Sequence, residues 1–266
     1  MLSIITPVLN GARFIGRNIR SIEQLSIEYQ HIVVDGGSTD GTQDVVGRNK
    51  RVVLVEQRGA TGMYGAINQG IRNSEGDYCA YVNCDDAVVP EGYEAMYRTI
   101  SSKRLAYVYS DAIMYYEKDR RAVLCSGVPF SRFFLRFGLL PFVQSSGMIS
   151  RKAFEDVGGF REKYKLIGDL DFFSRIAKCP TASSRYVRGV SSIFLKYGGS
   201  LGDRNAELYL KEMADADAKR SRCVPLLYSA IHRCINMYNY RLPRSANVAP
   251  ILRMFQESPE DNPASQ

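Results

Sequence analysis

The sequence predicts an α/β protein whose sheet is mostly parallel and carries flanking helices. The chain has 266 residues, 45% of them hydrophobic and 24% charged, which is ordinary for a globular protein with a substantial core. Over the first hundred residues, short apolar runs alternate with stretches whose apolar residues recur at helical spacing. Polar clusters follow three of these runs, as expected where parallel strands end at a binding crevice.

Each element of the first hundred residues has its own signal. Four apolar, largely β-branched runs predict strands at residues 2–6, 31–34, 52–55 and 78–82. The stretches between them predict helices, marked by Ile15, Ile19 and Ile22, by a run ending at Val46, and by Met63, Ile67 and Ile71. Strand–helix alternation at this spacing favours right-handed crossovers and a doubly wound sheet.

The second hundred residues follow a less regular pattern. Residues 107–110 and 122–125 are predicted strands, joined by a charged turn. A helix is predicted over 151–157, where two glycines end it, and another begins at Asp169. The last dozen residues are rich in Pro, Ser, Asn and Glu and are expected to form a frayed tail.

Composition and motifs exclude several classes of protein. The only histidines are His31 and His232, so a Ser-His-Asp triad or an H-E-x-x-H zinc site would depend on one of them. The six cysteines form no C-x-x-C pair, which argues against structural zinc and favours reduced thiols in a cytoplasmic protein. No signal peptide, membrane-spanning run, dinucleotide fingerprint, P-loop or nucleic-acid-binding motif is found, and no nucleic-acid partner is expected.

Two adjacent carboxylates, Asp85 and Asp86, directly follow the fourth predicted strand. Like charges in contact are costly unless a cation neutralises them. Mg²⁺ and Mn²⁺ commonly use one or two carboxylates together with phosphate oxygens of a substrate. A divalent metal site is therefore one interpretation, and a solvated turn, where Asp is common, is the other.

Asp35 and Asp169 each allow a structural and a functional interpretation. Asp35 ends a strand before two glycines, so it either bonds a ribose or base of a ligand or closes a turn. Asp169 precedes an apolar helix face and is either a general base or an N-cap, and position alone favours the N-cap. Because histidine is scarce, any base in this chain is expected to be a carboxylate.

Taken together, the motifs resemble glycosyltransferase family 2, an inverting class with the GT-A fold. Five segments carry the resemblance: S-I-I-T-P-V-L-N at 3–10, V-D-G-G-S-T-D-G-T at 34–42, G-M-Y-G-A-I-N-Q-G-I at 62–71, N-C-D-D at 83–86 and G-D-L-D at 168–171. The third is similar to a stretch of a bacterial subgroup that builds surface polysaccharides and glycolipids. The fourth stands at the family's D-x-D metal motif and the fifth at its E-D motif, which holds the catalytic base.

The resemblance implies transfer of a sugar from a nucleotide-diphosphate donor, UDP-type foremost, to a hydroxyl of a glycan or lipid-linked acceptor. It implies a GT-A domain over 1–205, with a nucleotide-sugar half at 1–105 and an acceptor half at 106–205, followed by a basic helical extension at 206–266. Asp169 is the implied catalytic base. Mn²⁺ or Mg²⁺ is the implied cofactor, held by Asp85 and Asp86. The motif leaves open which of the two carboxylates binds the ion.

The resemblance also assigns contacts to individual residues. The implied donor-binding residues are Pro7, Leu9, Asn10, Asp35, Gly36, Ser38, Met63, Asn68 and Asp85. The candidate acceptor or lid residues are Gln144, Ser145, Lys196 and Ser200, the last from a segment similar to a Gly-Gly-Ser loop that closes the active site in relatives.

Four positions depart from the family pattern. Asn83 replaces the first acid of D-x-D-D, Gly168 replaces the Glu of E-D, Gly65 replaces an Asp of the subgroup, and Val143 stands where relatives often carry His. The departures leave room for a catalytically inactive scaffold relative. A sugar nucleotidyltransferase is a second alternative, although its Gly-rich basic loop is absent after the first strand.

The formal net charge of +7 is concentrated near the C-terminus. Residues 219–253 contain seven Lys and Arg and no Asp or Glu, with Leu226, Leu227, Ile231 and Ile235 at helical spacing. Two interpretations stay open. The segment either lies on an anionic membrane surface, at the inner face of the cell membrane, or packs as a helix on the domain's core.

Overall fold

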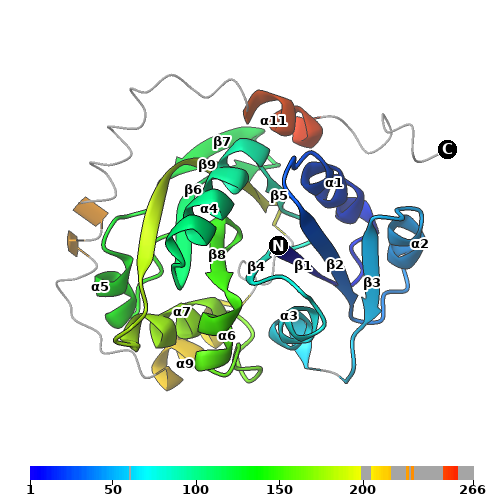
Figure 1. Ribbon diagram of the computed structural model, residues 1–266. Helices are drawn as coiled ribbons and strands as arrows, with labels where there is room; N and C mark the ends of the chain where they lie inside the picture. Colours follow the sequence, from blue (N-terminus) through cyan, green and yellow to red (C-terminus); the bar gives the residue numbers. More distant parts are fainter. Residues whose placement is uncertain (60, 199–204, 217–225, 228, 231–247, 257–266) are drawn as a thin grey trace.

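The four apolar runs of the first hundred residues form parallel strands, as the alternating pattern predicts. In the computed structural model they are β1 (Leu2–Val8), β2 (Tyr29–Asp35), β3 (Val52–Glu56) and β4 (Tyr78–Tyr81), paired in the order β3-β2-β1-β4. The structure describes residues 1–59, 61–198, 205–216, 226–227, 229–230 and 248–256. The predicted α/β class is confirmed (Figure 1).

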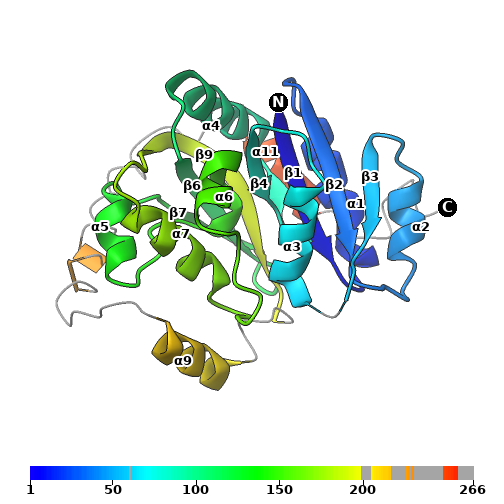
Figure 2. The ribbon, with the colours of Figure 1, turned by 60° about the horizontal axis from the view of Figure 1, so that its bottom comes forward.

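Helices cover both faces of this sheet (Figures 1 and 2). Apolar side chains of α1 (Ala12–Glu23), α2 (Thr42–Gly47) and α4 (Pro90–Lys103) pack on one face. Those of α3 (Gly62–Arg72), α6 (Arg151–Asp156) and α7 (Gly168–Lys178) pack on the other, where they form an aromatic-rich core. Because helices cover both faces, the sheet is doubly wound. The helical spacing of apolar residues in the connecting stretches predicts this arrangement.

The second half of the sheet is largely antiparallel. β6 (Tyr107–Tyr116) is antiparallel to β7 (Arg121–Cys125) and to β8 (Gly147–Ser150), which joins β4. β9 (Ser184–Lys196) is parallel to β6 and antiparallel to β5 (Ala87–Val88). The halves predicted at 1–105 and 106–205 thus share one sheet, and their division of labour stays a prediction.

Several elements were not predicted, and four of them show why the sequence signal was missed. β9 carries polar residues at core positions, because Ser191 and Ser192 are fully buried. β5 and β8 are too short to show a period. α4 begins at Pro90, which suits the first turn of a helix, but the sequence carried no polar cluster that drew attention to it.

The C-terminal segment contributes a helix to the core. α11 (Val248–Gln256) buries Ile251 and Phe255 against Phe14 and Tyr115, at the edge of the sheet near α1 (Figure 1). Core packing is therefore observed for the end of the basic segment. Leu226 and Leu227 are exposed. Residues 219–225 and 231–247 lie outside the described residues, so membrane contact through them stays a prediction.

Two further findings concern the cysteines and the helices. The cysteines at 79, 84, 125 and 179 are free thiols. Within the ranges that the structure describes, no helix has the length and apolarity needed to cross a membrane.

Candidate active site

The loops that follow β1, β2 and β4 meet at one edge of the sheet, as their positions predict. The Asn10 backbone N–H donates to Ser38 Oγ at 2.8 Å, and the Thr39 N–H donates to Asn10 Oδ1 at 2.9 Å. Gly11 lies so close to the β4 loop that a Cβ there would stand 2.9 Å from Cys84 Sγ. The three predicted polar clusters therefore lie side by side at this edge of the sheet.

Asp35 organises the loop after β2. Its carboxylate accepts hydrogen bonds from Ser38 Oγ at 2.5 Å, Gln43 Nε2 at 2.6 Å, and the N–H groups of Ser38 and Gly37 at 3.0 and 3.3 Å. Burial raises the pKa of this carboxyl, but the donors outweigh it, and the pKa is lowered. Asp35 is thus held ionised inside its own turn, and its contact with a donor base stays a prediction.

The other residues predicted to bind the donor differ in accessibility. Leu9 is 63% exposed, and the adjacent Asn10 is also exposed and has a backbone φ of +52. Pro7 is buried within β1. Gly36 is exposed, and its N–H donates to the Val8 carbonyl at 2.8 Å. Met63 is half-buried against the core.

Asn68 is fully engaged by a neighbouring loop. Its Nδ2 donates to the Phe160 carbonyl at 2.8 Å and to Glu162 Oε1 at 3.1 Å, while its Oδ1 accepts from the Phe160 N–H at 2.8 Å. No N–H of this amide is left for a ligand. The structure therefore gives Asn68 a structural task that the motif alone did not reveal.

The two adjacent carboxylates lie at the end of β4. Asp86 is fully buried, and its Oδ1 accepts from the Leu195 N–H at 3.1 Å. Burial and the Asp85 charge raise the pKa of Asp86 well above its usual range. Burial also raises the pKa of Asp85, against the guanidinium of Arg17 and a hydrogen bond from Tyr197. The site thus holds two acids that resist simultaneous ionisation.

Unpartnered oxygens at this loop fit a hard divalent cation. Among the described residues, five buried side-chain polar atoms have no hydrogen-bond partner, and Asn83 Oδ1, Asp86 Oδ2 and Arg17 Nε are three of them. Carboxylate and amide oxygens are the ligands that Mg²⁺ and Mn²⁺ prefer. The described residues contain no cluster of three or more His, Cys, Asp or Glu side chains, so substrate oxygens would complete the coordination.

Arg17 and Tyr197 border the carboxylates and were not predicted. Arg17 Nη2 donates to the Asp85 carbonyl at 3.3 Å, and its guanidinium lies 3.8 Å from the centre of the Phe255 ring of α11. Burial lowers the pKa of Arg17 to about 10. Tyr197 packs on Phe14 at 4.8 Å. Only the position of Tyr197 beside the Gly-Gly-Ser segment offered a sequence signal.

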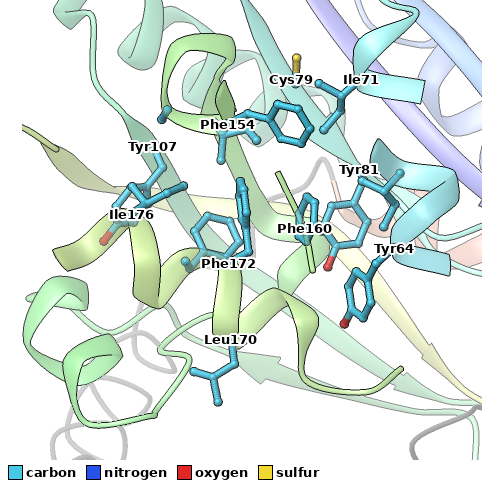
Figure 3. Close-up of a cluster of buried hydrophobic side chains, with 14 of the residues drawn as sticks. Tyr64, Ile71, Cys79, Tyr81, Tyr107, Phe154, Phe160, Leu170, Phe172 and Ile176 are labelled. Carbon is cyan, nitrogen blue, oxygen red and sulfur yellow. The ribbon is translucent and has the colours of Figure 1, made fainter. Parts of the chain in front are cut away.

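Asp169 lies at the start of α7. Its Oδ1 accepts from the Leu170 N–H at 2.8 Å and from the Tyr64 hydroxyl at 3.5 Å. Burial raises the pKa of Asp169 to about 6. Tyr64 comes from α3 and packs beside Phe160 and Tyr81 (Figure 3). A carboxylate with a pKa near neutrality is suited to accept a proton at physiological pH.

Two departures from the family pattern stand where a side chain would clash with a neighbour. A Cβ on Gly168 would stand 2.5 Å from the Tyr64 ring, and a Cβ on Gly65 would stand 1.9 Å from Thr61 Oγ1. Any side chain at either position would displace that neighbour. Gly168 therefore leaves room for the Tyr64 ring beside Asp169, and Gly65 leaves room for Thr61.

We expect Gly168→Ala to lower the free energy of unfolding by about 1–3 kcal/mol, because the methyl group overpacks the Tyr64 ring. Urea unfolding of the purified variant measures this. Gly47→Ala is the matched control, since Gly47 ends α2 with nothing within 4 Å of its Cβ position. Equal stability of Gly168→Ala and the control would contradict the packing argument.

The candidate acceptor or lid residues lie mainly beside the carboxylates. Ser145, in η1 (Gln144–Ser146), is fully buried and donates to Ser192 Oγ at 3.1 Å. It also lies close enough to Asp86 to lower that pKa. Gln144 is half-buried next to it. Lys196, at the end of β9, acts electrostatically on Asp85. Ser200 lies outside the described residues.

Comparison with known proteins identifies the family of this site. Residues 3–158 match the family model described as Glycosyl transferase family 2. A PGL/p-HBAD biosynthesis glycosyltransferase of Mycobacterium bovis (strain BCG / Pasteur 1173P2) is 25% identical over 214 residues, covering 75% of this chain and 78% of the relative. An uncharacterized glycosyltransferase of Rickettsia conorii is 28% identical over 196 residues, covering 66% of this chain and 31% of that protein.

Solved structures share the fold at low identity. S. aureus TarS 1-349 in complex with UDP-GlcNAc superposes with a TM-score of 0.60 at 17% identity, covering 94% of this chain and 78% of that one. Mannosyltransferase PcManGT from Pyrobaculum calidifontis, in complex with GDP-Man and Mn2+, gives 0.56 at 17% identity, covering 95% and 68%. The mixed sheet with flanking helices is thus the GT-A fold. The family match and the named relatives identify a glycosyltransferase and not the nucleotidyltransferase alternative.

Proposed function

Because the chain belongs to glycosyl transferase family 2, we propose that this glycosyltransferase works by metal-dependent, inverting transfer from a nucleotide-diphosphate sugar to an acceptor hydroxyl. The observation that carries the proposal is that two carboxylates of this site, Asp86 and Asp169, have different surroundings. Asp86 has a buried oxygen without a partner among the described residues, whereas Asp169 stands apart with a raised pKa. Tyr81 lies within electrostatic reach of both acids.

The donor is a sugar on a nucleoside diphosphate, with UDP as the first candidate. TarS and PcManGT are solved with UDP-GlcNAc and GDP-Man. In this chain the nucleoside would lie against the exposed Leu9 and Asn10 and the turn that Asp35 closes, and their exposure and hydrogen bonds support this. Asp85 and Asp86 would hold Mn²⁺ or Mg²⁺, and the ion would neutralise negative charge on the leaving diphosphate.

Asp169 removes the proton of the acceptor hydroxyl. The acceptor oxygen forms a bond to the anomeric carbon while the bond from that carbon to the diphosphate breaks, and the diphosphate leaves with the bonding electrons. The proton goes to Asp169, whose pKa of about 6 keeps it ionised before the reaction. Attack from the face opposite the leaving group inverts the anomeric centre.

A thermal-shift screen tests donor and metal together. Full-length protein is heated with UDP-GlcNAc, GDP-Man or further UDP- and GDP-sugars, each with Mn²⁺ and with EDTA. A ligand at about 100 times its Kd stabilises by about 2.7 kcal/mol. We expect at least one nucleotide sugar to raise the Tm only when Mn²⁺ is present. A set of donors that raises the Tm equally in EDTA, or not at all, would contradict the proposal.

The rate should depend on pH through Asp169. Because burial raises the pKa of Asp169 to about 6, kcat/KM is expected to fall about tenfold per pH unit below that value and to level off above it. A pH–rate profile of donor turnover measures this limb. A rate that stays constant from neutral pH down to about pH 5 would remove Asp169 from the proton transfer.

The acceptor is a glycan or lipid-linked hydroxyl in surface polysaccharide or glycolipid assembly, reached at the inner face of the cell membrane. The support is the basic stretch 219–253 and the exposed Leu226 and Leu227. We expect joint replacement of Lys219, Arg220 and Arg222 by Glu to reduce binding to anionic vesicles, while α11 stays on the core. Undiminished co-sedimentation with phosphatidylserine-containing vesicles would contradict membrane contact through this segment.

A further inference from the structure

A buried carboxylate outside the motifs named above binds the backbone of residues 165–167, which precede Asp169. Glu212 lies on α9 (Ala206–Asp215), which sits beyond α7 at the bottom of Figure 2. Its side chain accepts three consecutive backbone N–H groups: Lys165 at 2.7 Å, Leu166 at 2.9 Å and Ile167 at 3.2 Å. Only 7% of Glu212 is exposed. Hydrogen bonds from backbone N–H groups to a carboxylate are among the stronger ones in proteins.

These three N–H groups lie just before the base. α7 begins at Gly168, and its N-cap Ile167 has no side-chain oxygen, so α7 has no cap of its own. Glu212 bonds the backbone at this point from another helix. The Asp169 carboxylate is itself tied to the adjoining backbone through the Leu170 N–H. A displacement of residues 165–167 would therefore carry the Asp169 carboxylate with it.

The attachment of α9 does not require a charge at this position. Met213 on the same helix is buried in the main core, and Lys163 forms an ion pair with Asp215 at 2.6 Å. An apolar residue at 212 would add to this packing without the cost of burying a carboxylate. What Glu212 adds is the restraint on three N–H groups.

We propose that Glu212 is a positioning residue for the catalytic base, holding residues 165–167 so that the Asp169 carboxylate stays aligned with the acceptor hydroxyl. This inference rests on the proposed function, in which Asp169 removes the acceptor proton. Glu212 then supports the base from α9, a helix that follows the G-D-L-D motif of residues 168–171 in the chain.

Several titratable groups face this region and are kept unchanged in the test. They are Tyr64 of α3, Tyr81 of β4, Glu162, Lys163 and Tyr164 of the loop before α7, and Asp215 of α9. Glu212→Gln keeps the size of the side chain but places an NH₂ group against backbone donors. Glu212→Asp keeps the charge and shortens the reach. Glu207→Gln, exposed in the first turn of α9, is the matched control.

The measurements are kcat, KM and Tm, with the nucleotide sugar that gives the largest thermal shift as substrate. Misplacement of a catalytic group by about 1 Å can lower the rate about 100-fold. We expect Glu212→Gln to lower kcat about 10- to 100-fold with donor KM unchanged, Glu212→Asp to retain more activity than Glu212→Gln, and Glu207→Gln to match the wild type.

A double variant separates this inference from the proposed function. If Glu212 acts through the base, Glu212→Gln adds no further loss of kcat in an Asp169→Asn background. A full additional loss in that background, wild-type kcat in Glu212→Gln, or less activity in Glu212→Asp than in Glu212→Gln would overturn the positioning role. Unchanged turnover of Asp169→Asn alone would instead overturn the proposed function.

Discussion

Asp169→Asn is expected to keep nucleotide-sugar binding and to lower turnover by about 10²–10⁴, the usual contribution of a well-placed general base. The amide retains the hydrogen-bonding oxygen that meets the Leu170 N–H, so the fold around α7 should be preserved. What it loses is the ability to accept the acceptor proton. Initial rates and thermal shifts with the same donor measure the two properties separately.

Asp171→Asn is the matched control for this variant, two residues along the same helix. The Asp171 carboxylate forms ion pairs with Arg175 at 2.9 Å and Arg161 at 3.1 Å. Its replacement should lower stability and leave the chemical step nearly intact, because those contacts are structural. Equal turnover of Asp169→Asn and wild type, or an equal loss of turnover in Asp169→Asn and Asp171→Asn, would contradict the assignment of Asp169 as the catalytic base.

Asp86→Asn is expected to abolish the metal-dependent part of donor binding and to make the metal-free protein more stable. The Asp86 carboxylate is buried beside Asp85, and its Oδ2 has no partner among the described side chains and backbone groups. Because burial disfavours the ionised carboxylate, replacing it by a neutral amide of the same size is expected to raise the free energy of unfolding at neutral pH by about 1–3 kcal/mol. Donor titration with Mn²⁺ and urea unfolding in EDTA measure the two effects.

The stability gain should grow with pH. The pKa of Asp86 in the folded protein is raised above its value in the unfolded chain, so its contribution to stability is complete at low pH and is lost as the pH rises. Asp111→Asn is the contrasting control. Burial raises the pKa of Asp111 as well, but both of its carboxylate oxygens are occupied: Oδ1 accepts from the Gly127 N–H and the Tyr186 hydroxyl, and Oδ2 accepts from the Gly189 N–H. An amide there would set its NH₂ group against one of these donors, so the same change should destabilise. Destabilisation of metal-free Asp86→Asn would contradict the argument.

Most of residues 1–105 could be predicted from sequence because their signals are local. The spacing of apolar residues in α1 and α3 and the β-branched strands indicate a parallel, doubly wound sheet by the rules of parallel crossovers. The meeting of the three strand-end loops follows from that topology. Asp85, Asp86 and Asp169 were predicted because their places in the chain match short motifs.

Contacts between distant parts of the chain could not be predicted in this way. Tyr64 meets Asp169 across 105 positions, and Glu212 reaches Ile167 across 45. Neither contact leaves a local pattern in the sequence. Gly168 was open to misinterpretation from sequence, because the missing Glu of the E-D motif left room for an inactive protein. In the structure, the Tyr64 ring approaches Gly168 so closely that a side chain there would clash with it.

Some sequence signals could be interpreted only once the contacts of the residues were known. Asn68 stands in a family motif, yet its amide is used up by the loop at Phe160 and Glu162. The basic C-terminal segment allowed two interpretations, and α11 shows that Phe255 packs in the core and meets Arg17 at the carboxylate loop. Helical periodicity does not say which surface a helix covers.

The most direct test of the central claim is the release of nucleoside diphosphate from UDP-GlcNAc, GDP-Man and related nucleotide sugars by the full-length chain, with Mn²⁺ and with EDTA. The account predicts that at least one donor is turned over with Mn²⁺, and that EDTA and Asp86→Asn each abolish this turnover. Absence of turnover with every donor, as an inactive scaffold would show, or an equal rate in EDTA, would contradict it.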